Sequence, residues 1–135
     1  MGAMGAMGAM GARGAMTVSG FRRIALSLEG AVEGAHFGHA DFRVGNRIFA
    51  TLGYPDRSHG MVGLTPDQQR AHLREHPKVF LPVTGKWGEQ GATLVLLRSA
   101  DEETVGEALT LAWQNAVAKG PTRGSAKRTR ARTRR

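Results

Sequence analysis

The chain has no cysteine among its 135 residues. This absence excludes a disulfide framework, a zinc site with thiolate ligands and a cysteine nucleophile, and a reducing cytosol is the compartment that fits most easily. Long apolar runs are absent as well, because no stretch of the sequence reaches the length of a membrane span. We therefore expect a cytoplasmic protein that makes no use of a membrane.

Acidic residues are missing from both ends of the chain. All eleven Asp and Glu lie between Glu29 and Glu107, and residues 17–118 also hold ten Lys and Arg, so this segment has a net charge of −1. The formal net charge of +8 therefore belongs to the ends. Because the length suits one core, we predict a single domain at residues 17–118, between a head at 1–16 and a basic tail at 119–135.

The head is a low-complexity run in which Met-Gly-Ala repeats with a period of three residues. It holds five of the six Met and five of the 19 Gly, none of which we expect to pack in a core. It lacks the positive start and continuous apolar segment of a secretory signal. We interpret it as an artefact of expression or of an over-extended start upstream of Met16.

The tail has eight Lys and Arg and no acid in seventeen residues, with Gly, Pro, Ser and Thr between them. Such a composition predicts a disordered segment that binds polyanions by releasing counterions. If all eight engaged duplex phosphates, log K would fall against log salt with a slope of about −7. The alternative is a solvated tail whose nucleic-acid affinity is incidental. The basic residues are Lys119, Arg123, Lys127, Arg128, Arg130, Arg132, Arg134 and Arg135.

Apolar spacing between the two ends predicts three helices and five strands. The first helix runs from about Val18 to Leu28, because its apolar residues recur at helical intervals before Gly30. A capping box of Thr65 and Gln68 starts the second helix, which ends at His76 before Pro77, and Ser99 with Glu102 suggests a second capping box for the third. The predicted strands are 41–44, 47–54, 60–64, 79–83 and 92–98, with Gly45-Asn46 as a hairpin turn.

This order, α-β-β-β-α-β-β-α, predicts the α+β class. We expect an antiparallel sheet packed against helices rather than a doubly wound parallel sheet, because runs of strands are interrupted by single helices. The strand at 92–98 is too uniformly apolar for an exposed edge, so we expect it inside the sheet.

Histidines supply the first candidate site. His36 and His39 with Asp41 form the tightest cluster, but residues three apart on a strand point to opposite faces, so the two imidazoles converge only if the chain bends near Gly38. His72 and His76 share a helix face without a third ligand. Ordinary surface or hydrogen-bonded histidines explain both groups, and no serine has the context of a nucleophile. We predict no metal, no cofactor and no catalytic residue.

A glycine-rich connection, Thr84–Gly91, supplies the second candidate site. Its Lys86, Trp87, Gly88 and Gly91 resemble a phosphate-binding loop only in part, because the segment leads into a strand and not into a helix. Trp87 between glycines is either a packing plug or a surface on which a nucleic-acid base stacks.

Several segments together resemble the MmcQ/YjbR-like family over about residues 20–119. The matching segments are Leu26–Glu33, His36-Phe-Gly, Phe42-Arg-Val, Arg47–Leu52, Leu64–Gln68, Phe80-Leu-Pro-Val, Gly85, Trp87-Gly88, Gly91-Ala-Thr, Leu94–Leu97 and Ala112-Trp113. The resemblance implies a compact α+β domain similar to the frataxin (CyaY)-like and double-wing DNA-binding folds. The family is usually described as DNA-binding and has no agreed reaction, so the resemblance implies no catalytic residue here. Frataxin-like iron binding would need more carboxylates than 101–107 provide.

Three hypotheses of function follow. The first is a non-enzymatic protein that contacts double-stranded DNA through the tail, and through Arg43 and Arg47 on either side of the Gly45-Asn46 hairpin turn. The second is a protein- or small-ligand-binding module whose site is the Trp87 loop and the sheet face, with an incidental tail. A small-molecule enzyme that uses His36, His39 and Asp41 comes third.

Overall fold

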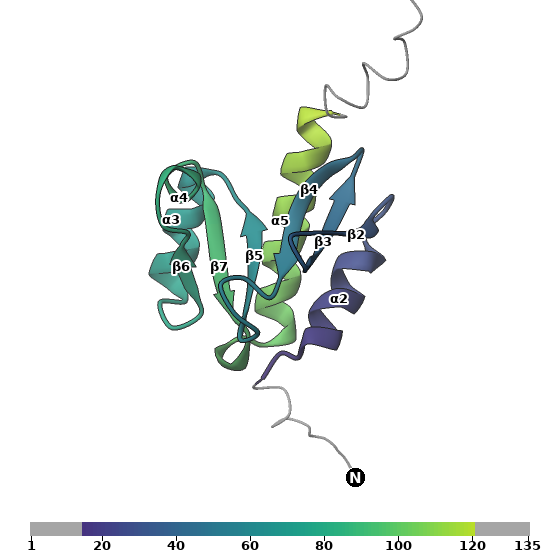
Figure 1. Ribbon diagram of the computed structural model, residues 1–135. Helices are drawn as coiled ribbons and strands as arrows, with labels where there is room; N and C mark the ends of the chain where they lie inside the picture. The colour runs from purple at the N-terminus through teal and green to yellow at the C-terminus, as the bar shows by residue number, and fades with distance from the viewer. Residues whose placement is uncertain (1–14, 121–135) are drawn as a thin grey trace, which may run out of the picture.

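The computed structural model describes residues 15–120, and Figure 1 shows their arrangement. Residues 1–14 of the head and the tail beyond Gly120 lie outside the described residues. Met16, the last residue of the head, is buried in the core, and its amide donates to the Leu97 carbonyl at 3.1 Å. The expectation that no methionine of the head packs in a core is therefore wrong for Met16. The elements are α2 (Val18–Ser27), β2 (Val32–His36), β3 (His39–Val44), β4 (Arg47–Leu52), β5 (His59–Gly63), α3 (Pro66–Glu75), β6 (Phe80–Pro82), α4 (Lys86–Glu89), β7 (Ala92–Leu96) and α5 (Glu102–Lys119). The expected α+β class is confirmed.

All strands pair antiparallel in one sheet of order β2-β3-β4-β5-β7-β6. The first four form a meander in chain order. β7 lies between β5 and β6, so the strand predicted from its apolar run is an interior strand, as expected. Register places Asp41 opposite Thr51, and Thr51 opposite Met61. These three side chains therefore lie on the same face of the sheet.

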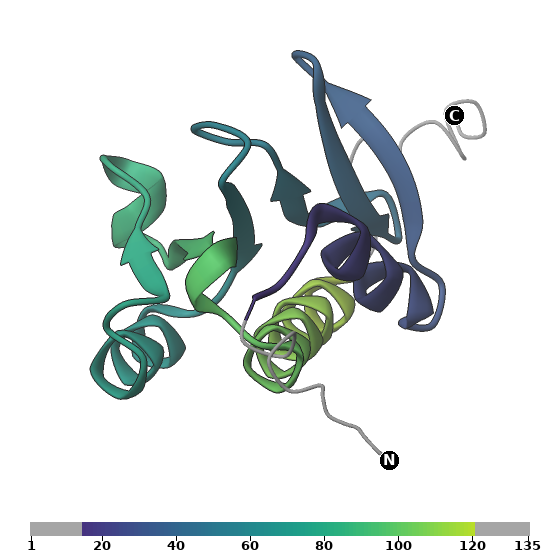
Figure 2. The same ribbon diagram turned by 90° about the horizontal axis from the view of Figure 1, so that it is seen from below.

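The helices α2, α3 and α5 lie on one side of the sheet, and we call the other side the open face (Figure 2). The core fills the space between sheet and helices. Phe21 of α2 packs against Phe42 of β3 with ring centroids 6.1 Å apart, and both are fully buried. A β carbon on Gly60 would lie 2.8 Å from the Phe21 ring, so this glycine lets the ring lie directly against β5.

Side-chain caps fix where the helices begin. Thr65 and Gln68 form the predicted capping box at α3, and Thr17 caps α2 by accepting from the Gly20 amide at 2.9 Å. The capping box predicted at Ser99 is wrong. Asp101 caps α5 by accepting from the Thr104 amide at 2.8 Å, because Ser99 belongs to a short 3₁₀ turn, Leu97–Ser99.

Two elements of the structure, β2 and α4, are not predicted from the sequence. The edge strand β2 occupies a segment predicted as a loop, and its sequence Val-Glu-Gly-Ala-His gives no apolar alternation. The helix α4 is four residues long and lies within the glycine-rich connection. Among the helices of residues 15–120, none is both long and apolar enough to cross a membrane.

Candidate ligand-binding groove

The sheet divides between β4 and β5, and this division creates a hollow. The two strands pair only at Ala50–Val62, Thr51–Met61 and Leu52–Gly60, so the beginning of β4 lies beyond the ladder. Figure 1 shows the strands separating there in front of α5. Asn115 of α5 donates to the Gly63 carbonyl at 3.0 Å and to Oε1 of Gln68 at 2.8 Å, which ties α5 to the end of β5.

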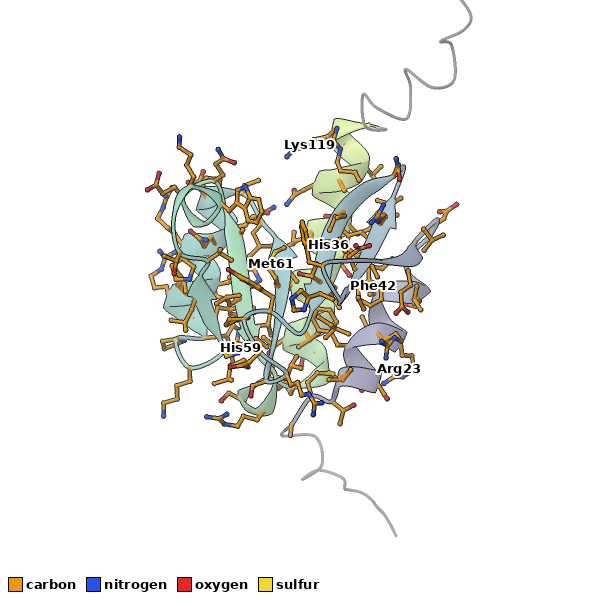
Figure 3. The ribbon with its side chains drawn as sticks, in the orientation of Figure 1. Arg23, His36, Phe42, His59, Met61 and Lys119 are labelled. Carbon is orange, nitrogen blue, oxygen red and sulfur yellow. The ribbon has the colours of Figure 1, made fainter. Side chains whose placement is uncertain are left out.

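The hollow continues across the open face with a volume of about 670 Å³, and we call it the sheet groove. In Figure 3 the labelled His36 and Met61 both lie over the middle of this face, and Lys119 lies at the end of α5. Residues of β2, β3, β4, β5 and β7 line it, together with residues of the connecting segments and of α5. The lining is His36, Phe37, His39, Arg47, Ile48, Phe49, Thr51, Tyr54, Met61, Gly63, Leu64, Thr65, Pro66, Val83, Trp87, Gln90, Ala92, Ala112, Asn115, Ala116 and Lys119.

Trp87 contributes to the groove from α4, and its side chain is 69% exposed. It therefore does not fill the core, and of the two roles predicted for this residue the packing plug is wrong. The second tryptophan, Trp113, is the one that packs against the core, and its Nε1 donates to the Glu29 carbonyl at 2.8 Å. Trp87 is left as an apolar surface inside a concave site.

The glycines beside Trp87 hold α4 against the sheet. A β carbon on Gly88 would lie 1.6 Å from the Val83 carbonyl oxygen, and one on Gly91, whose φ is +115°, would lie 1.9 Å from that of Leu64. Nε2 of the buried Gln69 donates to the carbonyls of Gly88 and Ala92 at 3.1 and 2.9 Å. The glycines of this connection therefore serve close backbone packing that fixes the position of Trp87.

Phe37 contributes to the groove from the turn between β2 and β3, and it is 93% exposed. Phe37 and Gly38 have φ of +50° and +80°, so a two-residue turn brings His36 and His39 into register opposite each other. A bulky aromatic residue at positive φ is a rare conformation, and Asn-Gly is the usual sequence of such turns. The strained backbone conformation therefore lies at Phe37, which is also the most exposed of the large hydrophobic residues in the described part of the chain.

Asp41 lies fully buried beneath the groove wall, where two neighbours compensate its charge. Nε and an NH2 group of Arg43 donate to its two oxygens at 2.7 and 3.0 Å, and His36 Nδ1 lies 2.7 Å from Oδ2. The hydrogen bond from Arg43 lowers the pKa of the carboxyl, against the opposing effect of desolvation, and the hydrogen bond from His36 lowers it further. Because an ionised carboxylate only accepts, Nδ1 of His36 carries the proton of this bond.

The bend that the two histidines need is present at Phe37-Gly38. His36 is nevertheless committed to Asp41, and His39 stacks edge-on to Tyr54 with centroids 6.2 Å apart. In the part of the chain that the structure describes, no group of three or more His, Asp or Glu is arranged to hold a metal. Nδ1 of His72 is bonded to the Gln68 carbonyl at 2.9 Å.

The two arginines predicted to contact DNA have partners within the fold. Arg43 is bound to Asp41, whereas Nε of Arg47 donates to the Gly120 carbonyl at 3.0 Å, at the end of α5. Arg47 lines the groove, and Arg43 does not. Lys86 is exposed in α4 and does not line the groove. The predicted contacts Lys127, Arg128, Arg130, Arg132, Arg134 and Arg135 lie outside the described residues.

Sequence reasoning misses most of the groove. Phe37 lies between the two histidines of the predicted cluster, and only Gly38 beside it is a usable turn signal. Arg43 and Asp41 are two residues apart in a predicted strand and so share a face, which is enough to predict the ion pair. Ala112 and Ala116 are expected only as part of an apolar helix face. No pattern in the sequence predicts that β4 and β5 separate.

Comparisons with known proteins agree with this fold. The YjbR family model matches residues 26–115. A similar solved structure is the Deinococcus radiodurans protein DR2400, which carries a DUF419 domain. It is 21% identical, with a TM-score of 0.66 over 84% of this chain and 87% of that one, and it bears on the fold alone. A comparison with curated proteins gives no match. Because the family model spans well over half of the sequence, this chain belongs to the YjbR family.

Proposed function

We propose that this protein binds a small ligand in the sheet groove. The observation that carries the proposal is a hollow of about 670 Å³ whose lining includes one exposed aromatic residue near each edge of the sheet, Phe37 and Trp87. Small-molecule sites are concave, mostly apolar and about 300–1,000 Å³ in volume. A groove of this size favours a small ligand over the flat and extensive contact that a folded protein partner makes.

The distribution of aromatic residues supports the proposal. The chain has eight, counted as five Phe, two Trp and one Tyr, and four of them line the groove: Phe37, Phe49, Tyr54 and Trp87. Tyr54 is 43% exposed, so three of the four offer a large apolar surface to an occupant. Contiguous exposed apolar surface of this kind marks interaction sites. Burying it under a ligand is favourable in proportion to the area removed from water.

We propose that the protein binds its ligand without converting it. His36 and Asp41 are paired as in sites that use a histidine as general base, but the same pairing anchors the β2–β3 hairpin over a buried carboxylate. Most of the lining is apolar, with the small side chains of Ala112 and Ala116 on the floor. Such surfaces select a ligand by shape and burial.

The test uses the dye N-phenyl-1-naphthylamine, whose emission increases in apolar surroundings. We expect saturable binding to the full chain and an affinity at least about tenfold lower for Trp87→Ala, the loss expected when about 1.4 kcal/mol of contact is removed. Leu81→Ala is the matched control, because Leu81 is an exposed apolar residue at 53% that does not line the groove. An absence of saturable binding, or equal losses in both variants, would refute the assignment.

Nucleic-acid binding is a second candidate, favoured by one contact. The bond from Arg47 to Gly120 holds the start of the basic 119–135 sequence beside the hairpin turn at Gly45-Asn46. We propose that phosphate contacts from that sequence supply the affinity and that Arg47 extends them onto the fold. The affinity would then depend steeply on salt.

Fluorescence anisotropy of a short duplex across a salt series tests this candidate. The full chain is compared with a variant in which Lys127, Arg128, Arg130, Arg132, Arg134 and Arg135 are Gln. If the slope of log K against log salt decreases in magnitude from as much as about −7 to about −2 in this variant, binding is assigned to these six residues. Binding that survives in this variant and weakens in Arg47→Gln would place a nucleic-acid surface on the domain. No binding in the full chain would remove the candidate.

A further inference from the structure

The groove has a charge pattern that the rest of the domain lacks. Residues 15–120 contain eleven Lys and Arg and eleven Asp and Glu, so this part of the chain is neutral. None of the eleven acids lines the groove, whereas Arg47 and Lys119 both do. Within the described part of the chain, neither cation forms an ion pair. The groove is therefore a positively charged site on a neutral domain.

The two cations lie at the same end of the groove. Nε of Arg47, the first residue of β4, donates to the carbonyl of Gly120, the residue after Lys119, at 3.0 Å. This bond leaves the remaining nitrogens of the guanidinium for another acceptor beside the end of α5. The C-terminal end of a helix carries about half a negative charge, which offsets only part of two full positive charges. An uncompensated positive charge remains beside the apolar floor.

The floor next to these cations is apolar, and the two residues that α5 contributes to it are alanines. Ala112 and Ala116 of α5 and the buried Phe49 of β4 form it, and Trp87 stands across the groove. An occupant that uses both parts needs an apolar body and a negative head at one end. A carboxylate or phosphate meets the planar donors of arginine and the point charge of lysine well.

We propose that the groove binds a small anionic amphiphile, with its carboxylate, sulfonate or phosphate head at Arg47 and Lys119 and its apolar body over Ala112, Ala116 and Trp87. This inference rests on the proposed function, since it assigns a ligand class to the same groove. Charge complementarity favours this class, because an uncharged ligand would leave both cations without a counter-ion and a cationic ligand would be repelled.

The test compares two dyes with the same naphthylamine body, of which only one carries a sulfonate. We expect the full chain to bind 1-anilinonaphthalene-8-sulfonate at least about tenfold tighter than N-phenyl-1-naphthylamine, and we expect about 0.5 M salt to reduce the difference. Lys119→Gln should weaken the sulfonate dye about three- to tenfold and leave the neutral dye unchanged. Lys119→Glu should remove the preference for the sulfonate dye.

Two control variants make the result specific, and a further variant changes Arg47 itself. Lys78→Gln changes an exposed lysine outside the groove and should alter neither dye. The six-Gln tail variant described above should keep the preference for the sulfonate dye, because the head group is assigned to Arg47 and Lys119. Arg47→Gln is read only after circular dichroism shows native helix content, because its bond to Gly120 also supports the fold.

Competition then identifies the head group. Dodecanoate and dodecyl phosphate should displace the sulfonate dye, and dodecanol should not; displacement by only one of the anions would name the head group. Equal binding of the two dyes with no effect of Lys119→Gln would overturn this inference and leave the proposed function standing. Binding of neither dye would overturn both. Displacement by a single-stranded oligonucleotide in preference to dodecanoate would transfer the site to nucleic acid and overturn the assignment.

Discussion

Gly34 stands opposite Asp41 in the β2–β3 ladder, and a β carbon on Gly34 would lie 3.1 Å from Oδ1 of Asp41 and 3.2 Å from Nε of Arg43. The missing side chain gives the ion pair room to lie flat against the edge strand. Arg43 and His36 then cover a carboxylate that has no access to solvent. The buried carboxylate of Asp41 therefore stabilises His36, a residue of the groove wall, although Asp41 itself does not line the groove.

Asp41→Asn should lower the free energy of unfolding by about 2 kcal/mol at pH 7, because it leaves the partly buried Arg43 without its counter-ion. The pKa of Asp41 is held below 3.8 in the folded state, chiefly by the hydrogen bond from Arg43. The stability that ionised Asp41 contributes is therefore fully present above the ordinary pKa and is lost as pH falls through the lowered one. Urea denaturation at pH 7, 4 and 3 measures this.

The difference between the wild-type chain and Asp41→Asn should therefore shrink from pH 4 downwards. A difference that stays constant across this range would mean that the carboxylate contributes no charge interaction. Arg43→Gln, alone and combined with Asp41→Asn, completes a double-mutant cycle that isolates the pair itself.

Gly88→Ala should destabilise the protein by about 3 kcal/mol or more, because the new methyl group would overlap the Val83 carbonyl and push α4 off the sheet. Gly106→Ala is the matched control. A methyl group on Gly106, inside α5, would have no neighbouring atom within 4 Å, so the same change there should stabilise by about 0.5–1 kcal/mol. Thermal unfolding followed by circular dichroism separates the two, and equal losses would refute the close contact at Gly88.

Asp101→Ala should cost about 1 kcal/mol, because the Asp101 side chain satisfies the Thr104 amide at the start of α5. The hydrogen bond from that amide also lowers the pKa of Asp101, so part of this stabilisation is lost at acidic pH. Ser99→Ala removes the other candidate cap and should change stability by less than about 0.5 kcal/mol. A larger effect at Ser99 than at Asp101 in urea denaturation would restore the capping box expected from the sequence.

Phe37→Asn should stabilise the fold by up to about 1 kcal/mol and weaken binding in the groove, because Asn-Gly suits the turn and the aromatic ring is lost. Phe37→Ala separates the two effects: it also removes the ring, but alanine tolerates positive φ poorly. Thermal unfolding and titration with N-phenyl-1-naphthylamine give both quantities on each variant. If Phe37→Asn bound the dye as tightly as the wild-type chain, Phe37 would have no part in the groove.

The fold is largely predictable because its helices begin at local signals and its interior strands are apolar. The capping box at Thr65 and the apolar run of β7 each depend on neighbours in sequence, and the structure confirms both. β2 escapes prediction because an edge strand with Gly34 at its centre is held by its partner β3 and by no pattern of its own. The predicted cap of α5 is misplaced by two residues because a 3₁₀ turn occupies Ser99.

The groove is predictable only in its parts. Trp87 stands out among its glycine neighbours in the sequence, but its exposure depends on how Gly88 and Gly91 pack on distant carbonyls. The place where β4 leaves β5 is a tertiary feature, held by the contact of Asn115 with Gly63, two residues 52 positions apart. The sequence predicts Arg47 as a DNA contact beside the Gly45-Asn46 turn, and its position beside Lys119 follows only from the contact between β4 and the end of α5.

The two alanines on the floor have a consequence for how such a protein could change its choice of ligand. Ala112 and Ala116 belong to α5, so this helix, together with Phe49 of β4, sets the depth of the groove. Replacing one methyl group by a larger side chain there shortens the longest occupant that fits, while the cationic end at Arg47 and Lys119 and the aromatic walls keep their places. Selectivity for chain length and selectivity for charge are therefore separable, and each can be altered by substitutions that leave the other intact.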